Sequence, residues 1–279
     1  MSNEKHTCCG KCHGHSNPVQ PKPHKLLDII KESPTEWTFR VENDLPIRDG
    51  QFMQVSLPKV GECPISISGY GEGYCDFTIR SVGKVTDALF ELQPGDTIFL
   101  RGCYGNGWPV EQYKGKNMVV IAGGTGVSPV KSLIDKFYQH PEEYGEVYII
   151  LGFKNEESIL FRETLDNWQK APNIHPIYTL DNEDKEGWEK GLVTAFIDRI
   201  PFKDFDGNYE CVVVGPPIMM KFVNLELLKF GVPEDKIWVS YERKMSCGIG
   251  KCGHCRIDDT YVCVDGPIFN YSFAKNLID

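Results

Sequence analysis

Four cysteines near the C-terminal end of the chain have the spacing of iron–sulfur ligands. Cys247, Cys252 and Cys255 form a C-x4-C-x2-C pattern, and Cys263 follows Cys255 eight positions later. In the plant-type version of this pattern, four thiolates hold a [2Fe–2S] cluster. The glycines between the cysteines suit a loop that wraps a cluster, because glycine lets the backbone turn sharply and bring its N–H groups close to sulfur. The pattern therefore indicates electron transfer.

A structural zinc site is the alternative for these four cysteines. Zinc modules usually pair their ligands as two C-x2-C units, and this stretch contains one such unit. A zinc-stapled module that binds a nucleotide without catalysing a reaction is the hypothesis from a different functional class. It predicts a colourless protein, whereas flavin and iron–sulfur groups absorb visible light.

Composition excludes several other classes of function. The chain has 279 residues, a formal net charge of −9 and eleven cysteines. The negative charge argues against nucleic acid as a partner, since phosphate binding requires a basic face. Apolar runs are too short to span a membrane, and the first residues lack the apolar core of a signal peptide. We therefore expect a cytoplasmic protein whose cysteines are reduced or bind metal.

The chain divides into four segments, which together must position the cysteines. Residues 1–24 read as a flexible tail, with a metal site at its cysteines and histidines as the alternative (Cys8, Cys9, Cys12, His13 and His15). Residues 25–111 contain short alternating stretches separated by Gly and Pro, which predict an antiparallel β-barrel. Residues 112–240 alternate apolar strands with helical stretches, which predicts a doubly wound parallel sheet. Residues 241–279 form the cysteine module.

Two loops in the α/β segment have the composition of nucleotide-binding turns. The first follows the apolar run MVVIA and opens a helix, and the second follows ECVVV and opens another. Glycine at such turns lets backbone N–H groups approach a pyrophosphate, although the G-x-G-x-x-P pattern differs from the simple dinucleotide fingerprint. The residues we predict to contact the nucleotide here are Gly123, Gly124, Thr125, Gly126, Pro129, Gly215, Pro216 and Pro217.

An acidic residue follows the third apolar run of this segment, IHPIYTL. Asp181 stands where a carboxylate can accept hydrogen bonds from an adenosine ribose. A 2′-phosphate would need a cation nearby, and Lys185 is four residues further on. We predict NADH rather than NADPH, with an ordinary solvated carboxylate as the alternative.

With these motifs the chain resembles the ferredoxin–NADP reductase superfamily, in the branch whose C-terminal module carries a [2Fe–2S] cluster. That branch contains electron-transfer subunits of dihydroorotate dehydrogenase B, of some hydrogenases (their gamma subunits) and of anaerobic sulfite reductases. The resemblance extends from about residue 25 to the C-terminus and rests on PISIS, TIRSVGKVTDAL, RGCYGNGWP, AGGTGVSP, VVGPP and YERKMSCGIGKCGHC.

The resemblance implies that the barrel binds FAD. Relatives have an arginine that holds the FAD pyrophosphate where this chain has Cys63, so Arg80 and the amides after it are the implied substitutes. The FAD-binding residues carried over are Pro64, Ile65, Ser66, Ile67, Arg80, Val82, Gly83, Lys84, Val85 and Thr86. No catalytic side chain is expected, because hydride chemistry belongs to the cofactors.

The implied function is an electron-transfer subunit that passes electrons from NADH through FAD and the cluster to a partner. The motif series is most similar to the electron-transfer subunit of anaerobic sulfite reductase. That resemblance implies a ferredoxin-like iron–sulfur subunit and a sirohaem-bearing sulfite reductase subunit as partners. The dihydroorotate dehydrogenase B and hydrogenase counterparts are the alternatives within the same chemistry.

Overall fold

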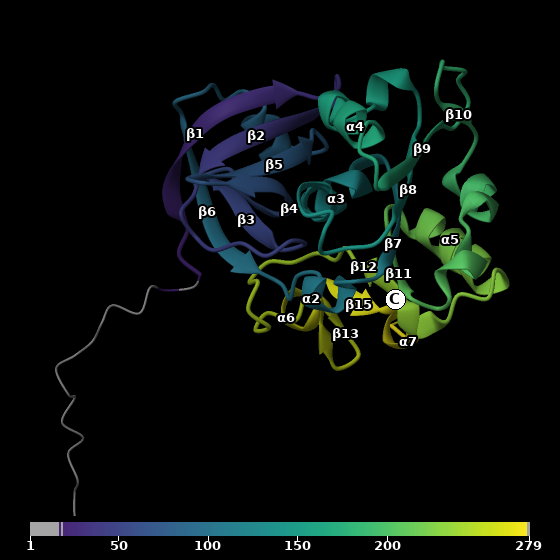
Figure 1. Cartoon of the computed structure of the whole chain (residues 1–279). Helices are drawn as coiled ribbons and strands as arrows, with labels where there is room; N and C mark the ends of the chain where they lie inside the picture. Colours follow the sequence, from purple (N-terminus) through teal and green to yellow (C-terminus); the bar gives the residue numbers. More distant parts are fainter. Residues whose placement is uncertain (1–16, 18, 278–279) are drawn as a thin grey trace, which may run out of the picture.

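The chain folds into a barrel, a parallel sheet with helices on both faces, and a small C-terminal module, as predicted (Figure 1). This computed structural model describes residue 17 and residues 19–277. The candidate metal ligands of the N-terminal tail lie outside the described residues. No helix in the described part of the chain combines the length and apolar character needed to cross a bilayer.

Six antiparallel strands close the barrel in the order β1-β2-β5-β4-β3-β6. Apolar side chains alternate along them and fill the interior, including Phe39, Met53 and Phe77, all fully buried. The first strand begins inside the segment read as tail, and a short helix follows the fifth. The elements are β1 (Lys22–Lys31), β2 (Glu36–Glu42), β3 (Phe52–Leu57), β4 (Gly61–Gly71), β5 (Tyr74–Arg80), α1 (Lys84–Leu89) and β6 (Thr97–Tyr104).

A seven-stranded sheet follows, in the order β10-β9-β8-β7-β11-β12-β15. Neighbouring strands are parallel except β15, which comes from the cysteine module and runs antiparallel to β12. The strands are β7 (Asn117–Gly123), β8 (Val147–Phe153), β9 (Ile174–Leu180), β10 (Glu189–Lys190), β11 (Tyr209–Val214), β12 (Ile237–Ser240) and β15 (Ile268–Asn270).

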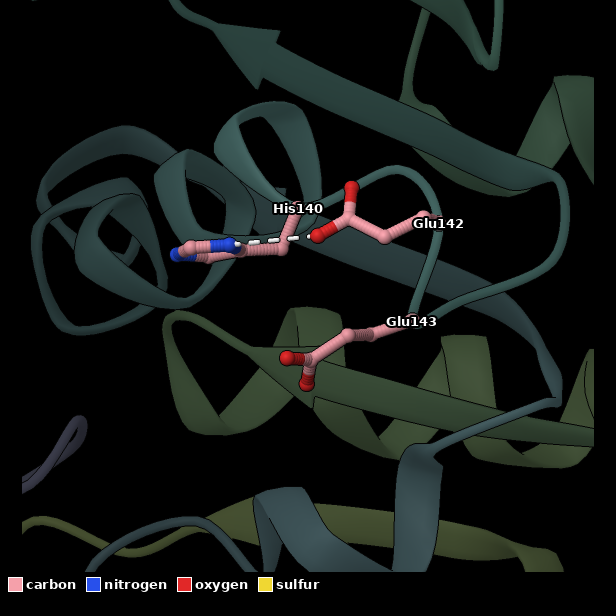
Figure 2. Close-up of side chains that lie close together, drawn as sticks. All are labelled: His140, Glu142 and Glu143. Carbon is pink, nitrogen blue, oxygen red and sulfur yellow. Dashed lines mark ion pairs between the residues drawn. The ribbon is translucent and has the colours of Figure 1, made fainter.

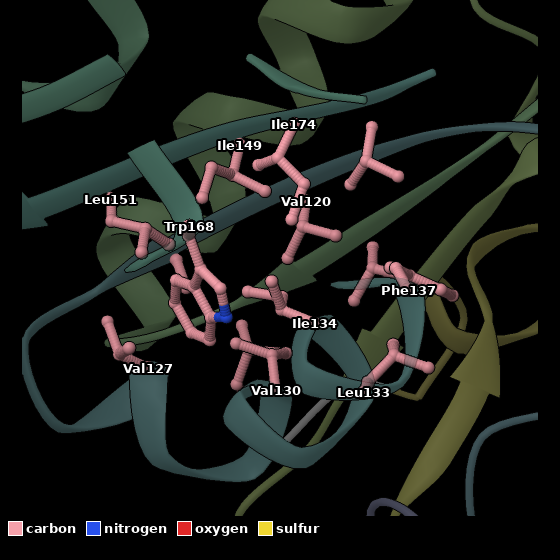
Figure 3. Packing of buried hydrophobic residues seen from close by; sticks show 14 of the residues in the cluster. Val120, Val127, Val130, Leu133, Ile134, Phe137, Ile149, Leu151, Trp168 and Ile174 are labelled. Carbon is pink, nitrogen blue, oxygen red and sulfur yellow. The ribbon is translucent and has the colours of Figure 1, made fainter. Parts of the chain in front are cut away.

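Helices cover both faces of the sheet because its central strands are apolar on both sides. One face packs on α3 and α4, with Leu133 and Trp168 in the shared core (Figure 3). The other packs on α5 and a 3-10 segment, η3. The helical elements are α2 (Val110–Tyr113), η1 (Gly124–Val127), α3 (Ser128–Gln139), η2 (Glu156–Ser158), α4 (Arg162–Gln169), η3 (Val193–Arg199), η4 (Phe202–Phe205), α5 (Pro217–Lys229) and η5 (Glu234–Lys236).

The cysteine module has little regular structure of its own. It contains a hairpin of two strands with two residues each, and two four-residue helices. It lies below the barrel and the sheet in the view of Figure 1. Besides β15, its elements are β13 (Arg256–Ile257), β14 (Thr260–Tyr261), α6 (Val262–Asp265) and α7 (Tyr271–Ala274). Cys263 therefore lies on α6, and the other three cysteines lie on loops.

Candidate functional site

A cavity of about 320 Å³ lies where the barrel meets the carboxyl edge of the sheet. Strand β4 contributes one wall and the loop that opens α3 contributes another. This cavity brings together many of the residues predicted to bind FAD and two predicted to bind the nucleotide, namely Pro64, Ile65, Ser66, Arg80, Val82, Thr86, Thr125 and Pro129. An apolar cleft with a few polar groups is the usual form of a cofactor site.

Other predicted FAD residues lie elsewhere. Ile67 is 1% exposed and belongs to the barrel core, since successive residues of a strand face opposite sides. The amides of Val82 and Gly83 both donate to the Thr86 hydroxyl at 3.0 Å. Those two amides are thus already occupied, and the predicted residues Gly83, Lys84 and Val85 are not among those that line the cavity.

Arg80 lines the cavity and is held from behind by a buried carboxylate. Its Nε donates to Glu36, which is 1% exposed and also accepts from the hydroxyls of Ser33 and Thr35. Burial raises the pKa of Glu36, but these hydrogen bonds and the Arg80 charge outweigh it and lower that pKa overall. Glu36 is therefore ionised and aims Arg80, whose side chain is 47% exposed.

Cys63, in the position where the resemblance implied an arginine, also lines this cavity. Burial, together with the nearby Glu62 carboxylate, raises the pKa of its thiol to about 11. The thiol is therefore neutral at physiological pH. It supplies no charge to a pyrophosphate, which leaves Arg80 as the cation of this wall.

The two predicted nucleotide loops touch each other. A Cβ added to Gly126 would lie 2.6 Å from the Gly215 Cα and 2.8 Å from the Val214 carbonyl oxygen. Strands β7 and β11 are neighbours, so their carboxyl ends place both loops at one point of the sheet edge. Only glycine allows backbones this close. The two loops therefore lie side by side at this edge, where Thr125 and Pro129 line the first cavity.

A second cavity of about 310 Å³ continues from Gly215 and Pro217 along α5 to the cysteine module. Asn224 on its wall is 2% exposed, and its Oδ1 has no hydrogen-bond partner among the described residues. Lys221 and Lys275 line the same cavity. An unsatisfied acceptor beside cations suits a ligand that carries both hydroxyl and phosphate groups, so we group this cavity with the nucleotide crevice.

Asp181 lies at the same sheet edge but away from both cavities. Its amide donates to the Phe153 carbonyl at 3.0 Å, directly after β9. Burial raises the pKa of its carboxyl group, and Lys154 opposes that shift. Lys185 pairs instead with Glu156. The carboxylate thus stands two strands from the glycine loops, where the far end of an extended dinucleotide would reach.

Sequence reasoning assigned no role to the stretch that separates the two cavities. Residues 240–243 line both of them, and Met245 lines the first. This stretch leaves the end of β12 and leads directly to Cys247. The sequence feature that could have identified this stretch is its position between a buried apolar run and the first cysteine, at the edge where ligands bind in α/β sheets.

The four predicted ligand cysteines lie together, and backbone N–H groups point at their sulfurs. The Cys247 Sγ accepts from the amides of Lys251 at 3.3 Å and Cys252 at 3.4 Å. Gly250 donates to the Cys263 Sγ at 3.3 Å, and Cys263 donates to the Cys255 Sγ at 3.4 Å. Such donors stabilise thiolates, which are the form that binds metal.

Positive φ angles explain the glycines in this loop. Gly248, Gly250 and Gly253 have φ angles of 74°, 70° and 79°, in the region that favours glycine. Although burial raises the pKa of Cys247, the backbone N–H groups lower it to about 6. Cys247 is next to Cys252, and Cys255 is next to Cys263, so the sulfurs form two adjacent pairs. The donor set therefore fits a thiolate-bound metal centre.

Another group of possible metal ligands lies on the surface after α3. His140, Glu142 and Glu143 place one ligand atom each within 4.8 Å of one another (Figure 2). The Lys114 ammonium is 3.1 Å from both Glu143 and Glu111, so the Glu143 carboxylate already has a cationic partner. We interpret this group as a surface ion-pair cluster.

Two segments of the chain match known protein families. Residues 120–224 match the family described as the oxidoreductase NAD-binding domain. Residues 242–273 match the iron–sulfur cluster binding domain of dihydroorotate dehydrogenase B. The first match covers both glycine loops and Asp181, and the second covers all four cysteines.

Relatives match over almost the whole chain. Sulfhydrogenase 1 subunit gamma of Pyrococcus furiosus is 34% identical over 271 residues, which cover 91% of this chain and 92% of the relative. A probable dihydroorotate dehydrogenase B (NAD(+)) electron transfer subunit of Methanocaldococcus jannaschii is 34% identical over 249 residues, 88% of each chain.

Solved structures show the same fold. The structure of an NADH-dependent reduced ferredoxin–NADP oxidoreductase matches with a TM-score of 0.75 and 27% identity, covering 89% of this chain and 88% of that one. A ferredoxin–NADP+ reductase from Neisseria gonorrhoeae with bound FAD and NADP matches with a TM-score of 0.64 and 18% identity, covering 76% of this chain and 92% of that one. The chain therefore belongs to the ferredoxin–NADP reductase-like family, in the group that carries the iron–sulfur cluster binding domain of dihydroorotate dehydrogenase B.

Proposed function

We propose that this chain takes electrons from NADH and passes them through FAD and a [2Fe–2S] cluster to a partner subunit. One observation carries the proposal. Met245 lines the cavity that we assign to the flavin, and Cys247, the first cluster ligand, follows two residues later. A flavin and a cluster at these two sites are separated by one short covalent path. That arrangement suits single-electron transfer between them.

The flavin site is assigned from the residues that line the first cavity. Pro64 and Ile65 offer an apolar surface to a ring system, and the Ser66 hydroxyl offers a polar contact. Arg80, aimed by Glu36, then faces the phosphates. When bound, FAD supplies the conversion of a two-electron hydride donor into single electrons.

The nucleotide site is assigned to the crevice of the two glycine loops. Gly123, Gly124 and Gly126 let one loop approach the pyrophosphate, and Gly215 lets the other approach. NADH is proposed over NADPH because Asp181 is an anion that would repel a 2′-phosphate, while Lys185 is engaged by Glu156. The chain's own part is to orient the nicotinamide beside the flavin.

The cluster is assigned as [2Fe–2S] rather than zinc from the arrangement of the thiols. Cys247 pairs with Cys252, and Cys255 pairs with Cys263. Two adjacent pairs suit two iron ions that each take two thiolates and share bridging sulfides. The N–H donors to sulfur would favour the more negatively charged reduced cluster, and so would the exposed Lys251 and His254 beside it.

The partner is an oxidoreductase subunit that accepts electrons at the cluster. The names of the relatives favour a hydrogenase or a dihydroorotate dehydrogenase partner over the sulfite reductase partner implied by the motif series. A sirohaem and its sulfite site would in any case lie on another subunit. Co-purification from the native organism under anaerobic conditions distinguishes the three partners by their activities.

Chemical analysis of anaerobically purified protein tests the proposal. We expect one flavin, two iron atoms and two acid-labile sulfides per chain, with flavin and cluster absorption that NADH bleaches. A Cys252→Ser variant, which changes the exposed ligand, should lose iron and keep flavin. Zinc without iron or flavin would refute the proposal and favour the non-catalytic module.

A further inference from the structure

A buried arginine of the barrel binds the backbone of the cysteine loop. Arg101 on β6 is 6% exposed. Its Nη1 donates to the Cys247 carbonyl at 2.6 Å and its Nη2 donates to the Ser246 carbonyl. Its Nε donates to Glu62 at 2.9 Å, and a second bond to the same carboxylate completes a bidentate pair. One guanidinium therefore joins two units that are 146 residues apart in sequence.

Two further barrel side chains contact the same loop. Gln54 on β3 is fully buried, and its Nε2 donates to the Met245 carbonyl at 2.9 Å. The carbonyls of three successive residues, Met245, Ser246 and Cys247, thus all accept from the barrel. The ring of Tyr104 lies against Gly248, where a Cβ would be 2.7 Å from it. Met245, which lines the first cavity, and Cys247, the first proposed cluster ligand, are therefore both fixed to the barrel.

These bonds also orient the loop peptides. The carbonyl and the next N–H of a trans peptide point in opposite directions. Because the carbonyls of Ser246 and Cys247 point at Arg101, the N–H groups of Cys247 and Gly248 point away from it. The loop then continues to the amides of Lys251 and Cys252, which donate to the Cys247 sulfur.

We propose that Arg101 is a positioning residue for electron transfer, which fixes Cys247 relative to the flavin cavity and whose buried charge favours the reduced cluster. The inference rests on the proposed function, since it requires a cluster at the cysteines. Glu62 weakens the effect of the Arg101 charge on the cluster, because its carboxylate offsets part of the positive charge that faces the cysteine loop. Charge at buried sites acts strongly on the reduction potential of a nearby cluster.

Opposite charge changes at this pair should shift the cluster potential in opposite directions. In Arg101→Met the cation is lost, so the midpoint potential of the cluster should fall. In Glu62→Gln the cation is no longer offset, so the potential should rise. In Arg101→Lys the charge remains, so the potential should stay close to that of the parent. A lysine nevertheless cannot hold both carbonyls and the carboxylate in one plane.

The experiment uses the full chain loaded with flavin and iron. Midpoint potentials come from redox titration followed by electron paramagnetic resonance, and rapid mixing with NADH separates flavin reduction from cluster reduction. We expect Arg101→Met to slow cluster reduction at least tenfold and to leave flavin reduction within twofold of the parent. Arg40→Met is the control, since Arg40 on β2 of the same barrel makes an equivalent bidentate pair with Asp76 and its side chain is 34% exposed.

The outcomes separate this inference from the proposed function. Parent protein without iron or flavin refutes the proposed function itself. A loaded parent whose Arg101→Met and Glu62→Gln variants keep its potential, its resonance spectrum and its rate of cluster reduction refutes only the role of Arg101. If Arg101→Met fails to fold, Arg101→Lys decides the question, because it keeps the charge and loses the fixed geometry: cluster reduction that stays within twofold of the parent refutes the positioning role.

Discussion

Different interactions stabilise the parallel sheet and the cysteine module. Strand β7 is buried on both faces, with Val119, Val120 and Ile121 all at zero exposure, and two helical layers cover it. The module contains two-residue strands and four-residue helices, and its loop is fixed by bonds to sulfur and to barrel side chains. Apolar burial stabilises the sheet. The module shares part of that apolar core through Ile257, Val262 and Phe269, and we expect its cysteine loop to depend in addition on the proposed metal centre.

Removing the metal centre should produce the largest difference between the two regions. In Cys255→Ser a buried ligand is lost, so we expect complete loss of the cluster spectrum. Hydrogen exchange should then rise throughout residues 247–265 and stay unchanged in β7. Cys211→Ser is the control, because Cys211 is buried in β11, outside the module. Equal increases in β7 and in the module would contradict the comparison.

A cavity in the sheet core should have the reverse effect. Leu133 on α3 is fully buried against the sheet (Figure 3). Leu133→Ala should lower the free energy of unfolding by about 3 kcal/mol, through lost burial and an unfilled cavity. Denaturant unfolding measures this, and iron per folded chain should not change. A loss of iron at native conditions would mean that the module relies on the sheet core more than its contacts indicate.

A single methyl group tests the contact between the glycine loops. In Gly126→Ala the added Cβ would collide with backbone atoms of Val214 and Gly215, which cannot move as a side chain can. The loops should separate, and the dissociation constant for NADH should rise at least tenfold, or about 1.4 kcal/mol. Flavin content should be unchanged. An unaltered dissociation constant would show that the nucleotide does not bind between these loops.

The smallest expected effect concerns Asp181. Burial raises the pKa of its carboxyl group, so as the pH falls through that pKa the carboxylate becomes protonated and accepts fewer hydrogen bonds. Affinity for NADH should therefore decrease on acidification. Asp181→Asn should cost about 1 kcal/mol, or roughly fivefold, and should abolish this pH dependence. Binding titrations at several pH values measure it, and NADPH should bind Asp181→Asn better than the parent.

Local patterns predicted the elements but not the contacts between them. Apolar runs and glycine turns were sufficient for β7, β11 and the helices that follow, and cysteine spacing indicated the four thiols that the structure brings together. The burial of Ile67 in the barrel, by contrast, depends on which face of β4 points inward. The bonds from Arg101 to the cysteine loop join distant segments, and no local pattern encodes such a contact. A single sequence can indicate which residues form a strand, but not which distant backbone groups their side chains contact.

The pairing of β15 with β12 has a consequence for how the module is built into the protein. Trp238 pairs with Asn270 and Ser240 pairs with Ile268, so the segment 241–267 leaves and re-enters the sheet at adjacent strands. Its two ends are therefore about 5 Å apart, the spacing of paired strands. The segment is thus an insertion that begins and ends on two paired strands of the sheet.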